Sequence, residues 1–308
     1  MSVIVTAFDQ GELVADAVES VLRQTRAPEA VLVVDDGSTD DASADVLERL
    51  RQDPRITVLR QPNRGVSAAR NAGIAAAGTD LVAVLDGDDR LAPTFLERTV
   101  AVLEGDPGAL AASSWLRAHG VIDAVVRPDG GSAVDFLHRN ACPATAVVRR
   151  DAWRACGGYD EDMRSGFEDW DFFLSLVAEG GHVAVVPEPL VEYRTAPASA
   201  NVRSMDSRLE LYGRLVDKHR AVFERHLREV LLALEARAMD AAGRWEDLVA
   251  ADSSLPLGEV TYGDGGMAVA VRIAVRRAQR GGGPVLPRTT SSVGMTVRAG
   301  GATDRDRS

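Results

Sequence analysis

Lysine is almost absent from this chain of 308 residues, which has one lysine, Lys218, among 35 basic residues. A P-loop needs a lysine in GxxxxGK[ST], and the sequence contains no such motif. The first apolar segment is followed by "FDQGEL" where a dinucleotide fold would have GxGxxG. The sequence therefore excludes the two commonest phosphate-binding loops.

Cysteine is scarce as well. Cys142 and Cys156 are the only two, and neither belongs to a CxxC motif. A structural zinc site and a disulfide framework are both excluded on this ground.

Basic residues are outnumbered, 35 against 46 acidic residues, which gives a net charge of -11. An acidic surface argues against nucleic acid or anionic lipid as the main partner.

Long apolar runs are also missing. "MSVIVTAFDQ" has neither the basic start nor the long apolar stretch of a secretory signal, and Arg272 interrupts the segment "GMAVAVRIAVRR". We expect no transmembrane segment, because the longest run is too short to cross a bilayer. The sequence predicts a cytoplasmic protein and allows a peripheral position at the inner membrane face.

What the first 105 residues do contain is a regular alternation of strands and helices. Continuous apolar strands are predicted at "SVIVTAF", "AVLVVDD", "RITVLR" and "DLVAVLD", and helical spacing of apolar residues follows each of them. β-Branched strands with helices between them are typical of a sheet buried on both faces. The predicted fold class is α/β, with a mostly parallel sheet flanked by helices.

The rest of the chain is less regular. A helix is predicted at "EDWDFFLSLVAEGG", and two short strands at "HVAVVP" and "PLVEYR". We expect one domain over residues 1–200, a helical C-terminal region over 204–252 that could mediate homo-oligomer formation, and a weakly structured tail over 253–308. The Gly- and Arg-rich composition predicts disorder beyond about residue 280.

Polar side chains gather where the predicted strands end. They are Thr6, the pair Asp35 and Asp36, and the cluster Asp86, Asp88 and Asp89. Ligands of such sheets bind at the carboxyl ends of the strands. The last cluster is not a calcium loop, because Leu91 stands where that loop needs glycine. Carboxylates here predict Mg²⁺ or Mn²⁺, completed by phosphate oxygens of a substrate.

Four segments in this order resemble the family 2 glycosyltransferases, of GT-A fold, over roughly residues 1 to 195. They are "TAFDQGELVADAVESVLRQT", "VLVVDDGSTDDA", "QPNRGVSAARNAGIAAAGTDLVAVLDGDD" and "GGYDEDMRSGFEDWDF". The resemblance implies transfer of a sugar, usually with inversion, from a nucleotide diphosphate sugar, with a UDP-sugar favoured, to an acceptor hydroxyl.

The resemblance also implies roles for individual residues. Thr6 and Asp36, with Asp35 beside them, would contact the nucleotide base, and Arg64 and Arg70 would lie near the nucleotide. Asp88, helped by Asp86 or Asp89, would hold the metal on the diphosphate. Asp169 would be the catalytic base, at the start of a helix whose dipole keeps it ionised, and Glu168 and Trp170 would shape the acceptor site.

Structural explanations compete with several of these roles. Asp35 to Asp41 can form a solvated turn and helix cap, Glu168 and Asp169 can serve only the helix dipole, and Trp170 can belong to the core. Many relatives carry a histidine soon after "YR", which this sequence lacks after Tyr193 and Arg194. Two other functions stay open, a sugar nucleotidyltransferase and a non-catalytic nucleotide-sugar binding module.

Overall fold

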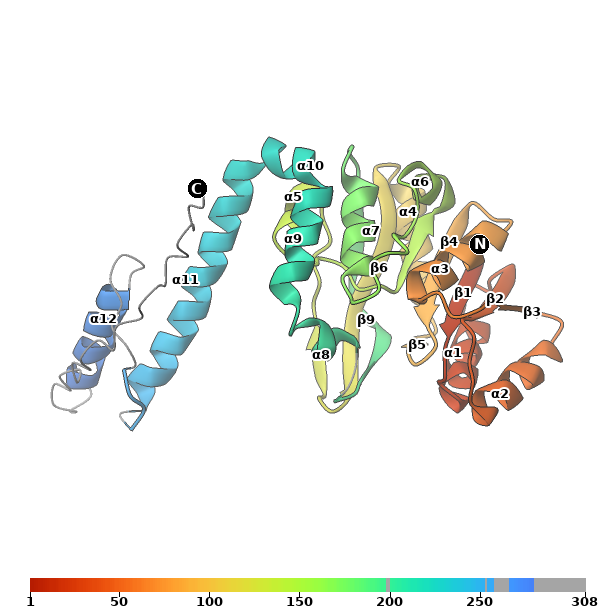
Figure 1. Cartoon of the computed structure of the whole chain (residues 1–308), viewed down its shortest axis with the longest axis horizontal. Coiled ribbons are helices and arrows are strands. Elements are labelled where there is room, and N and C mark those ends of the chain that lie inside the picture. The colour runs from red at the N-terminus through yellow and green to blue at the C-terminus, as the bar shows by residue number, and fades with distance from the viewer. Residues whose placement is uncertain (198–199, 253, 258–265, 280–308) are drawn as a thin grey trace, which may run out of the picture. The chain divides into compact units, whose positions relative to one another are not determined.

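The computed structural model describes residues 1–197, 200–252, 254–257 and 266–279 (Figure 1). The chain divides into two compact units, Met1–Ala233 and Leu234–Ser308. Among the described residues, no helix combines the length and the apolar character that crossing a membrane requires.

The first unit is built on one sheet of nine strands. In chain order these are β1 (Ser2–Ala7), β2 (Ala30–Asp35), β3 (Ile56–Arg60), β4 (Leu81–Asp86), β5 (Arg90–Leu91), β6 (Ala109–Gly120), β7 (Ala124–Val126), β8 (Ala146–Arg149) and β9 (His182–Thr195). Their order across the sheet is β3-β2-β1-β4-β8-β6-β9-β5, and β7 pairs with β6.

The helices of the first unit cover both faces of this sheet (Figure 1). They are α1 (Glu12–Leu22), α2 (Asp41–Arg51), α3 (Val66–Ala76), α4 (Phe95–Gly105), α5 (Ala133–Leu137), α6 (Arg150–Ala155), α7 (Glu168–Val177), α8 (Ala200–Ser204), α9 (Arg208–Lys218) and α10 (Arg220–Arg225). The helix α11 (Leu227–Ala251) begins in the first unit and continues into the second.

The half of the sheet formed by β3, β2, β1 and β4 is wholly parallel. Here the strands and intervening helices lie where the apolar patterns predict them, which confirms the predicted α/β fold. Beyond β4 the sheet is mixed: β8 runs antiparallel to β4 and β6, whereas β6 and β9 are parallel. The two short strands predicted around Pro187 are one strand, β9, whose pairing with β6 shifts register there.

Alternate strand residues point into two apolar cores. On one face, Ile4 and Val84 pack with residues of α3, α5, α7, α9 and α10. On the other face, Val3 and Val33 pack with α1, α2 and α4. Within α3, Gly73 allows the helix to approach β1, because a Cβ there would lie 2.4 Å from Ile4 Cγ2.

The helices α9 and α10 belong to the first unit, through buried Leu215, Val222 and Phe223. The unit therefore extends to Ala233, beyond the boundary near residue 200 that the sequence predicts. Their apolar faces lie in the same core as α7, so they complete the sheet's covering.

The second unit contains the C-terminal part of α11 and the helix α12 (Gly266–Gln279). Ile273 is fully buried against Val249 and Ala250, and Arg272 pairs with buried Glu246 at 2.9 Å. The predicted weakly structured tail over 253–308 is thus wrong for 266–279, where Val269 and Ile273 give a helix an apolar face. The disorder predicted beyond about residue 280 lies outside the described residues.

Candidate functional site

Three neighbouring strands bring the predicted site residues to one edge of the sheet. Thr6 of β1 lies opposite Asp86 of β4, and Ala7 lies opposite Asp35 of β2. The Thr6 hydroxyl donates to Asp86 Oδ1 at 3.2 Å. The carboxyl ends of these parallel strands therefore meet, as the ligand rule for such sheets requires.

Arg70 of α3 joins this edge to the start of α7. Its side chain is 2% exposed; Nη2 lies 2.8 Å from Asp86 Oδ1, and Nη1 lies 3.1 Å from Glu168 Oε1. Burial opposes the charged guanidinium, but the carboxylates of Asp86 and Glu168 outweigh it and raise the pKa of Arg70. Arg70 thus joins α3 to Glu168 of α7, which lies 98 residues further along the chain.

Asp88 has the most exposed side chain of the acidic cluster, 31% against 28% for Asp86, and Asp89 is buried. Asp88 accepts a hydrogen bond from Gln10 Nε2 at 3.2 Å and lies 3.6 Å from Arg194 Nη1. Burial, and then the nearby Asp86 charge, raise the pKa of Asp88.

Asp89 is buried, and its Oδ1 accepts the main-chain N–H of Arg194 at 2.9 Å. Burial is the main reason why the pKa of Asp89 rises to about 8, and Asp86 adds to it. Among the described residues, no three His, Cys, Asp or Glu side chains gather as a metal-binding group. Asp86 pairs with Arg70 and Asp89 binds the backbone, and the ligand set of Asp86, Asp88 and Asp89 stays a prediction.

Asp35 and Asp36 organise the loops around them. Asp35 has no exposed surface, accepts the Ser38 N–H at 2.8 Å and lies 3.3 Å from Arg60 Nε. The Asp35 carboxylate closes the turn after β2, and its place beside the nucleotide-binding residues stays a prediction. Asp36 accepts the N–H groups of Arg64 and Gly65 at 2.9 and 2.8 Å, and its contact with a nucleotide stays a prediction.

Asp169 lies in the first turn of α7, half-buried. Asn140 Nδ2 donates to its Oδ2 at 2.9 Å, and the Trp170 N–H donates to Oδ1 at 2.7 Å. Burial, followed by the neighbouring charge of Glu168, raises the pKa of Asp169 to about 7. Desolvation thus acts against the helix dipole, which we expect to help keep this carboxylate ionised. A pKa near neutrality suits a general base.

Trp170 is a core residue. It is 2% exposed, its Nε1–H donates to the Phe136 main-chain oxygen at 2.6 Å, and its ring packs 4.9 Å from that of Phe167. That Trp170 helps to shape the acceptor site stays a prediction. The buried indole anchors the first turn of α7 and so fixes the positions of Glu168 and Asp169.

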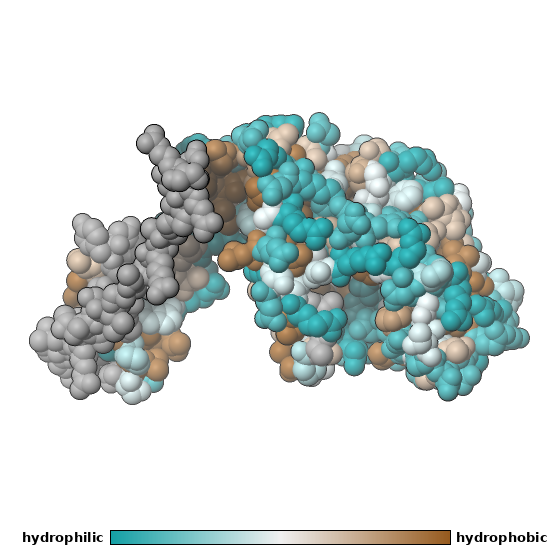
Figure 2. All heavy atoms as spheres, in the orientation of Figure 1, coloured by the Kyte–Doolittle hydropathy of each residue, from teal (hydrophilic) through white to brown (hydrophobic). Residues whose placement is uncertain are grey.

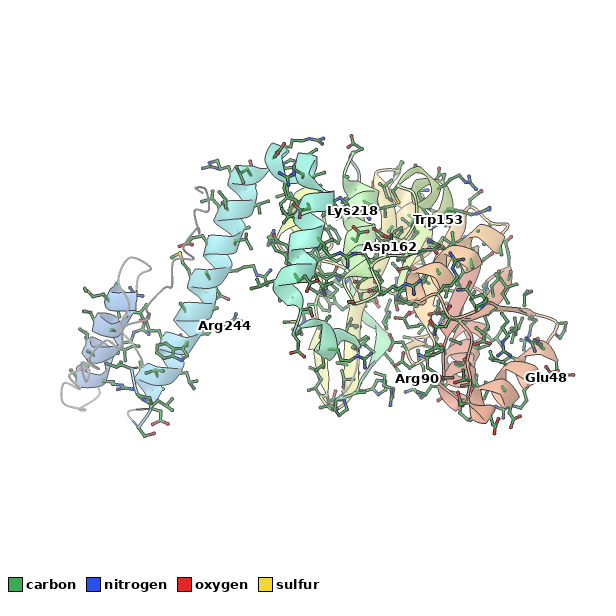
Figure 3. The ribbon with its side chains drawn as sticks, viewed as in Figure 1. Glu48, Arg90, Trp153, Asp162, Lys218 and Arg244 are labelled. Atoms are coloured by element: carbon green, nitrogen blue, oxygen red, sulfur yellow. The ribbon has the colours of Figure 1, made fainter. Side chains whose placement is uncertain are left out.

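A polar clasp fastens α7 to α9. Buried Asp171 accepts hydrogen bonds from Lys218 Nζ at 2.8 Å and interacts with His219 Nε2 at 2.8 Å. Lys218, labelled in Figure 3, also donates to Asp160 Oδ2 at 2.6 Å. His219 therefore contacts Asp171, which lies two residues after Asp169 in α7, and not the acidic cluster after β4.

Two pockets of similar volume lie on the first unit. The arginine pocket, as we call it, measures about 340 Å³ and is lined by Arg64, Ser67, Glu161, Arg164, Glu168 and Arg203, among others. Arg64, predicted near the nucleotide, points its guanidinium to Glu161 at 2.6 Å. The face of this unit seen in Figure 2 is mainly hydrophilic.

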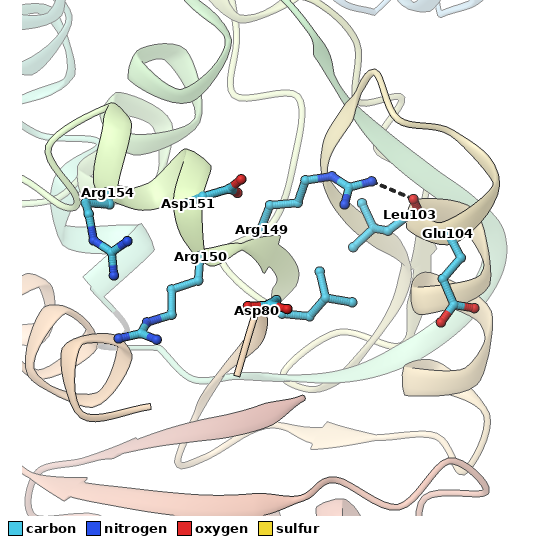
Figure 4. A pocket seen from close by; sticks show the side chains of 8 residues that line it. Asp80, Leu103, Glu104, Arg149, Arg150, Asp151 and Arg154 are labelled. Atoms are coloured by element: carbon cyan, nitrogen blue, oxygen red, sulfur yellow. Dashed lines mark hydrogen bonds between the residues drawn. The ribbon is translucent and has the colours of Figure 1, made fainter. Parts of the chain in front are cut away.

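The second pocket, of about 350 Å³, lies at the opposite end of β4, where Asp80 and Leu81 begin the strand (Figure 4). Its three arginines face three carboxylates, and Arg149 turns back to the Leu103 main-chain oxygen at 2.6 Å. From Leu81 to Asp86 the strand rises by about 17 Å, at the usual rise of a β-strand. This pocket is therefore remote from the candidate site.

Three residues of the site have roles that the sequence analysis did not predict: Gln10, Asn140 and Arg194. Gln10 follows β1 and Arg194 is the second-last residue of β9, so the rule that selected Thr6 and Asp86 could have found them. Asn140 lies in an irregular segment 29 residues before Asp169, and no local pattern indicates their contact.

Comparison with known proteins identifies the family. Residues 2–153 match the model of "Glycosyl transferase family 2". A glycosyltransferase of Haemophilus influenzae is 31% identical over 192 residues, covering 59% of this chain and 70% of the relative. The succinoglycan biosynthesis protein ExoU of Rhizobium meliloti is 30% identical, covering 60% of this chain and 58% of ExoU. EpsJ of Bacillus subtilis is 28% identical, covering 65% and 62%.

The fold resembles that of S. aureus TarS. A crystal structure of TarS 1-349 in complex with UDP-GlcNAc has a TM-score of 0.55 at 18% identity, covering 65% of this chain and 59% of TarS 1-349. At that identity the likeness concerns the fold. The chain spans about three fifths of the length of EpsJ and ExoU. With its sheet, its strand-end aspartates and its sequence relatives in agreement, the chain belongs to glycosyl transferase family 2.

Proposed function

We propose that the chain transfers a sugar, with inversion, from a nucleotide diphosphate sugar to an acceptor hydroxyl. One observation carries this proposal: the buried Arg70 holds Asp86, beside the open carboxylate of Asp88, to Glu168, beside the candidate base Asp169. A single displacement needs two separate groups of side chains, which we call poles. One stabilises the leaving group, and the other accepts the proton of the acceptor hydroxyl.

At the first pole, a divalent ion would neutralise the leaving diphosphate. The donor set fits Mg²⁺ or Mn²⁺, because both prefer carboxylate and phosphate oxygens and are often held by one or two protein carboxylates. Asp88 is the carboxylate that would hold it, and Gln10 and Arg194 orient Asp88. When bound, the metal supplies Lewis acidity that stabilises the departing nucleotide.

At the second pole, Asp169 takes the proton of the attacking hydroxyl. Asn140 fixes one carboxylate oxygen and the Trp170 N–H the other, so the base is held in one orientation. Because its pKa is about 7, Asp169 is partly ionised at neutral pH and basic enough to accept a proton. Attack from this side and departure from the other invert the anomeric centre.

UDP is the favoured nucleotide of the donor. Support comes from the likeness to TarS, of which structures in complex with UDP and UDP-GlcNAc are known. A polysaccharide is the favoured acceptor class, since the relative ExoU is a succinoglycan biosynthesis protein.

Nucleotide binding tests the metal pole. We expect UDP to bind about tenfold more tightly with Mn²⁺ or Mg²⁺ than with a chelator, and Asp88→Ala to abolish this gain, since that carboxylate is the protein's main hold on the ion. Titration calorimetry measures both affinities. The matched variant is Asp45→Ala on the exposed face of α2, which should keep the metal effect. Equal UDP affinity with metal and with chelator would remove the ion from the proposal.

The released product separates this function from its two rivals. A transferase releases a nucleoside diphosphate, a sugar nucleotidyltransferase releases pyrophosphate, and a binding module releases neither. The contact of Asn140 with Asp169 favours the transferase, because a module that only binds the donor has no use for an oriented base.

We also propose that the second unit forms homo-oligomers through α11. Its Leu234, Ala238, Ala241, Trp245 and Leu248 are exposed and recur at spacings of four and three residues, the period of a coiled-coil seam. A second copy presents the same seam, so we expect a dimer by light scattering. The double change Trp245→Glu and Leu248→Glu should yield monomers, whereas Met267→Glu on α12 should not. A monomeric wild-type chain at high concentration would contradict the seam.

A further inference from the structure

The arginine pocket combines positive charge with two glutamates that are already paired. Glu161 accepts from Arg64 at 2.6 Å, and Glu168 accepts from Arg70 at 3.1 Å. Arg164, by contrast, directs Nε to the main-chain oxygen of Glu161 at 3.4 Å and has no carboxylate partner in the part of the chain that the structure describes. In a chain of net charge -11, this pocket is locally cationic.

The pocket also meets the N-terminus of α3, a helix of 11 residues. Gly65 is its N-cap and has no capping side chain of its own, and the Asp36 carboxylate accepts the Gly65 N–H at 2.8 Å just before the first turn, which leaves the N–H groups of that turn to a ligand. The first N–H groups of a helix attract an anion when no side chain satisfies them. The dipole of α3 therefore adds to the field of the arginines.

An independent observation indicates a ligand here. Ser67 lines the pocket and is 3% exposed, yet its Oγ has no hydrogen-bond partner. A buried hydroxyl without a partner costs free energy, so such groups are rare unless a ligand or water satisfies them. A bound anion would accept this hydrogen bond.

We propose that the arginine pocket binds a phosphate group carried by the acceptor. Phosphate fits better than carboxylate, because its several oxygens can accept together from a guanidinium, a hydroxyl and helix N–H groups. Glu168 lines the pocket and directly precedes Asp169, so an acceptor anchored there by its phosphate presents its hydroxyl near the base. This inference rests on the proposed function and adds the acceptor's chemical class to it.

Phosphate binding to the donor-loaded chain tests the inference. The full chain is saturated with UDP and Mg²⁺ and titrated with inorganic phosphate by calorimetry. We expect one phosphate to bind, with about tenfold weaker affinity in Arg164→Gln and about fivefold weaker affinity in Ser67→Ala, as for loss of a charged and a neutral hydrogen bond. UDP affinity should stay unchanged in both variants. Arg117→Gln, the same change of charge on β6, should leave phosphate binding unaltered.

Two further ligands distinguish the source of the phosphate. A sugar phosphate and a prenyl phosphate in detergent micelles are titrated in the same way, and the one that resembles the acceptor should bind more tightly than inorganic phosphate. Inorganic phosphate that binds as tightly as both esters would overturn the assignment to an acceptor. Phosphate that competes with UDP would overturn it too, because the pocket would then belong to the donor.

The pocket and the proposed function can fail separately. A wild-type chain that binds no UDP would contradict the nucleotide donor, whereas phosphate titrated without nucleotide still reports on the pocket. Absence of phosphate binding, or equal binding in the wild type and Arg164→Gln, would overturn the pocket while UDP binding stands.

Discussion

Asp169→Asn is expected to lower the rate of sugar transfer by about a hundredfold or more. The amide keeps the shape of the side chain but has no basic oxygen, so the acceptor hydroxyl loses its proton acceptor. UDP affinity should hardly change, because Asp169 belongs to the acceptor pole. The measurements are the transfer rate at saturating donor, the UDP affinity and the melting temperature.

The matched control for this change is Asp162→Asn, an exposed aspartate of the segment before α7 (Figure 3). It should transfer at the wild-type rate. If Asp169 acts only on the helix dipole, its replacement costs about 1 kcal/mol or less and leaves turnover intact. Wild-type turnover in Asp169→Asn would take this residue out of the mechanism.

The same base predicts how the rate depends on pH. Burial and Glu168 raise the pKa of Asp169 to about 7, and only the ionised carboxylate can accept a proton. The transfer rate should therefore rise with pH, pass its half-maximum near pH 7 and level off above it. A rate that is flat from pH 5 to pH 8 would contradict this role.

Arg70→Met should destabilise the first unit by about 3 to 5 kcal/mol, because it leaves Asp86 and Glu168 without their shared buried cation. For a chain of this size the melting temperature should fall by on the order of 10 °C. Thermal unfolding followed by circular dichroism measures the shift.

The control is Arg49→Met. Arg49 also pairs with a carboxylate, that of Glu12 at 2.6 Å, but both side chains are more than half exposed. Exposed pairs contribute about 1 kcal/mol or less, so this variant should unfold close to the wild-type temperature. Similar shifts for the two variants would show that the burial of Arg70 has no special energetic weight.

The sequence predicts the parallel half of the sheet well, because each strand there is a continuous apolar run buried on both faces. The mixed half escapes prediction for a physical reason. The strands β6 and β9 pair over 72 residues or more, and local patterns carry no information about this pairing. The helix α12 was missed because its burial depends on α11, not on its own hydrophobicity alone.

The residues of the site likewise divide into those that the sequence predicts and those that it does not. Thr6, Asp86 and Asp88 follow from one rule about strand ends. The surroundings of Asp35 and Trp170 escape prediction, because burial decides them: a fully enclosed carboxylate holds a turn, and an enclosed indole packs the core. The pairing of Arg70 with both Asp86 and Glu168 joins distant segments, and only the folded chain reveals it.

The polar clasp around Asp171 has a practical consequence. Its Lys218 is the only side-chain amine of the protein, so an amine-reactive reagent has a single side-chain target, and that target fastens α7, which carries Glu168 and Asp169. A label on Lys218 would remove the charge that Asp160 and Asp171 share. Because the Lys218 side chain is 39% exposed, the rate of attachment reports how often its amine leaves these two carboxylates, and this makes the opening of the polar clasp measurable by mass spectrometry without any substitution.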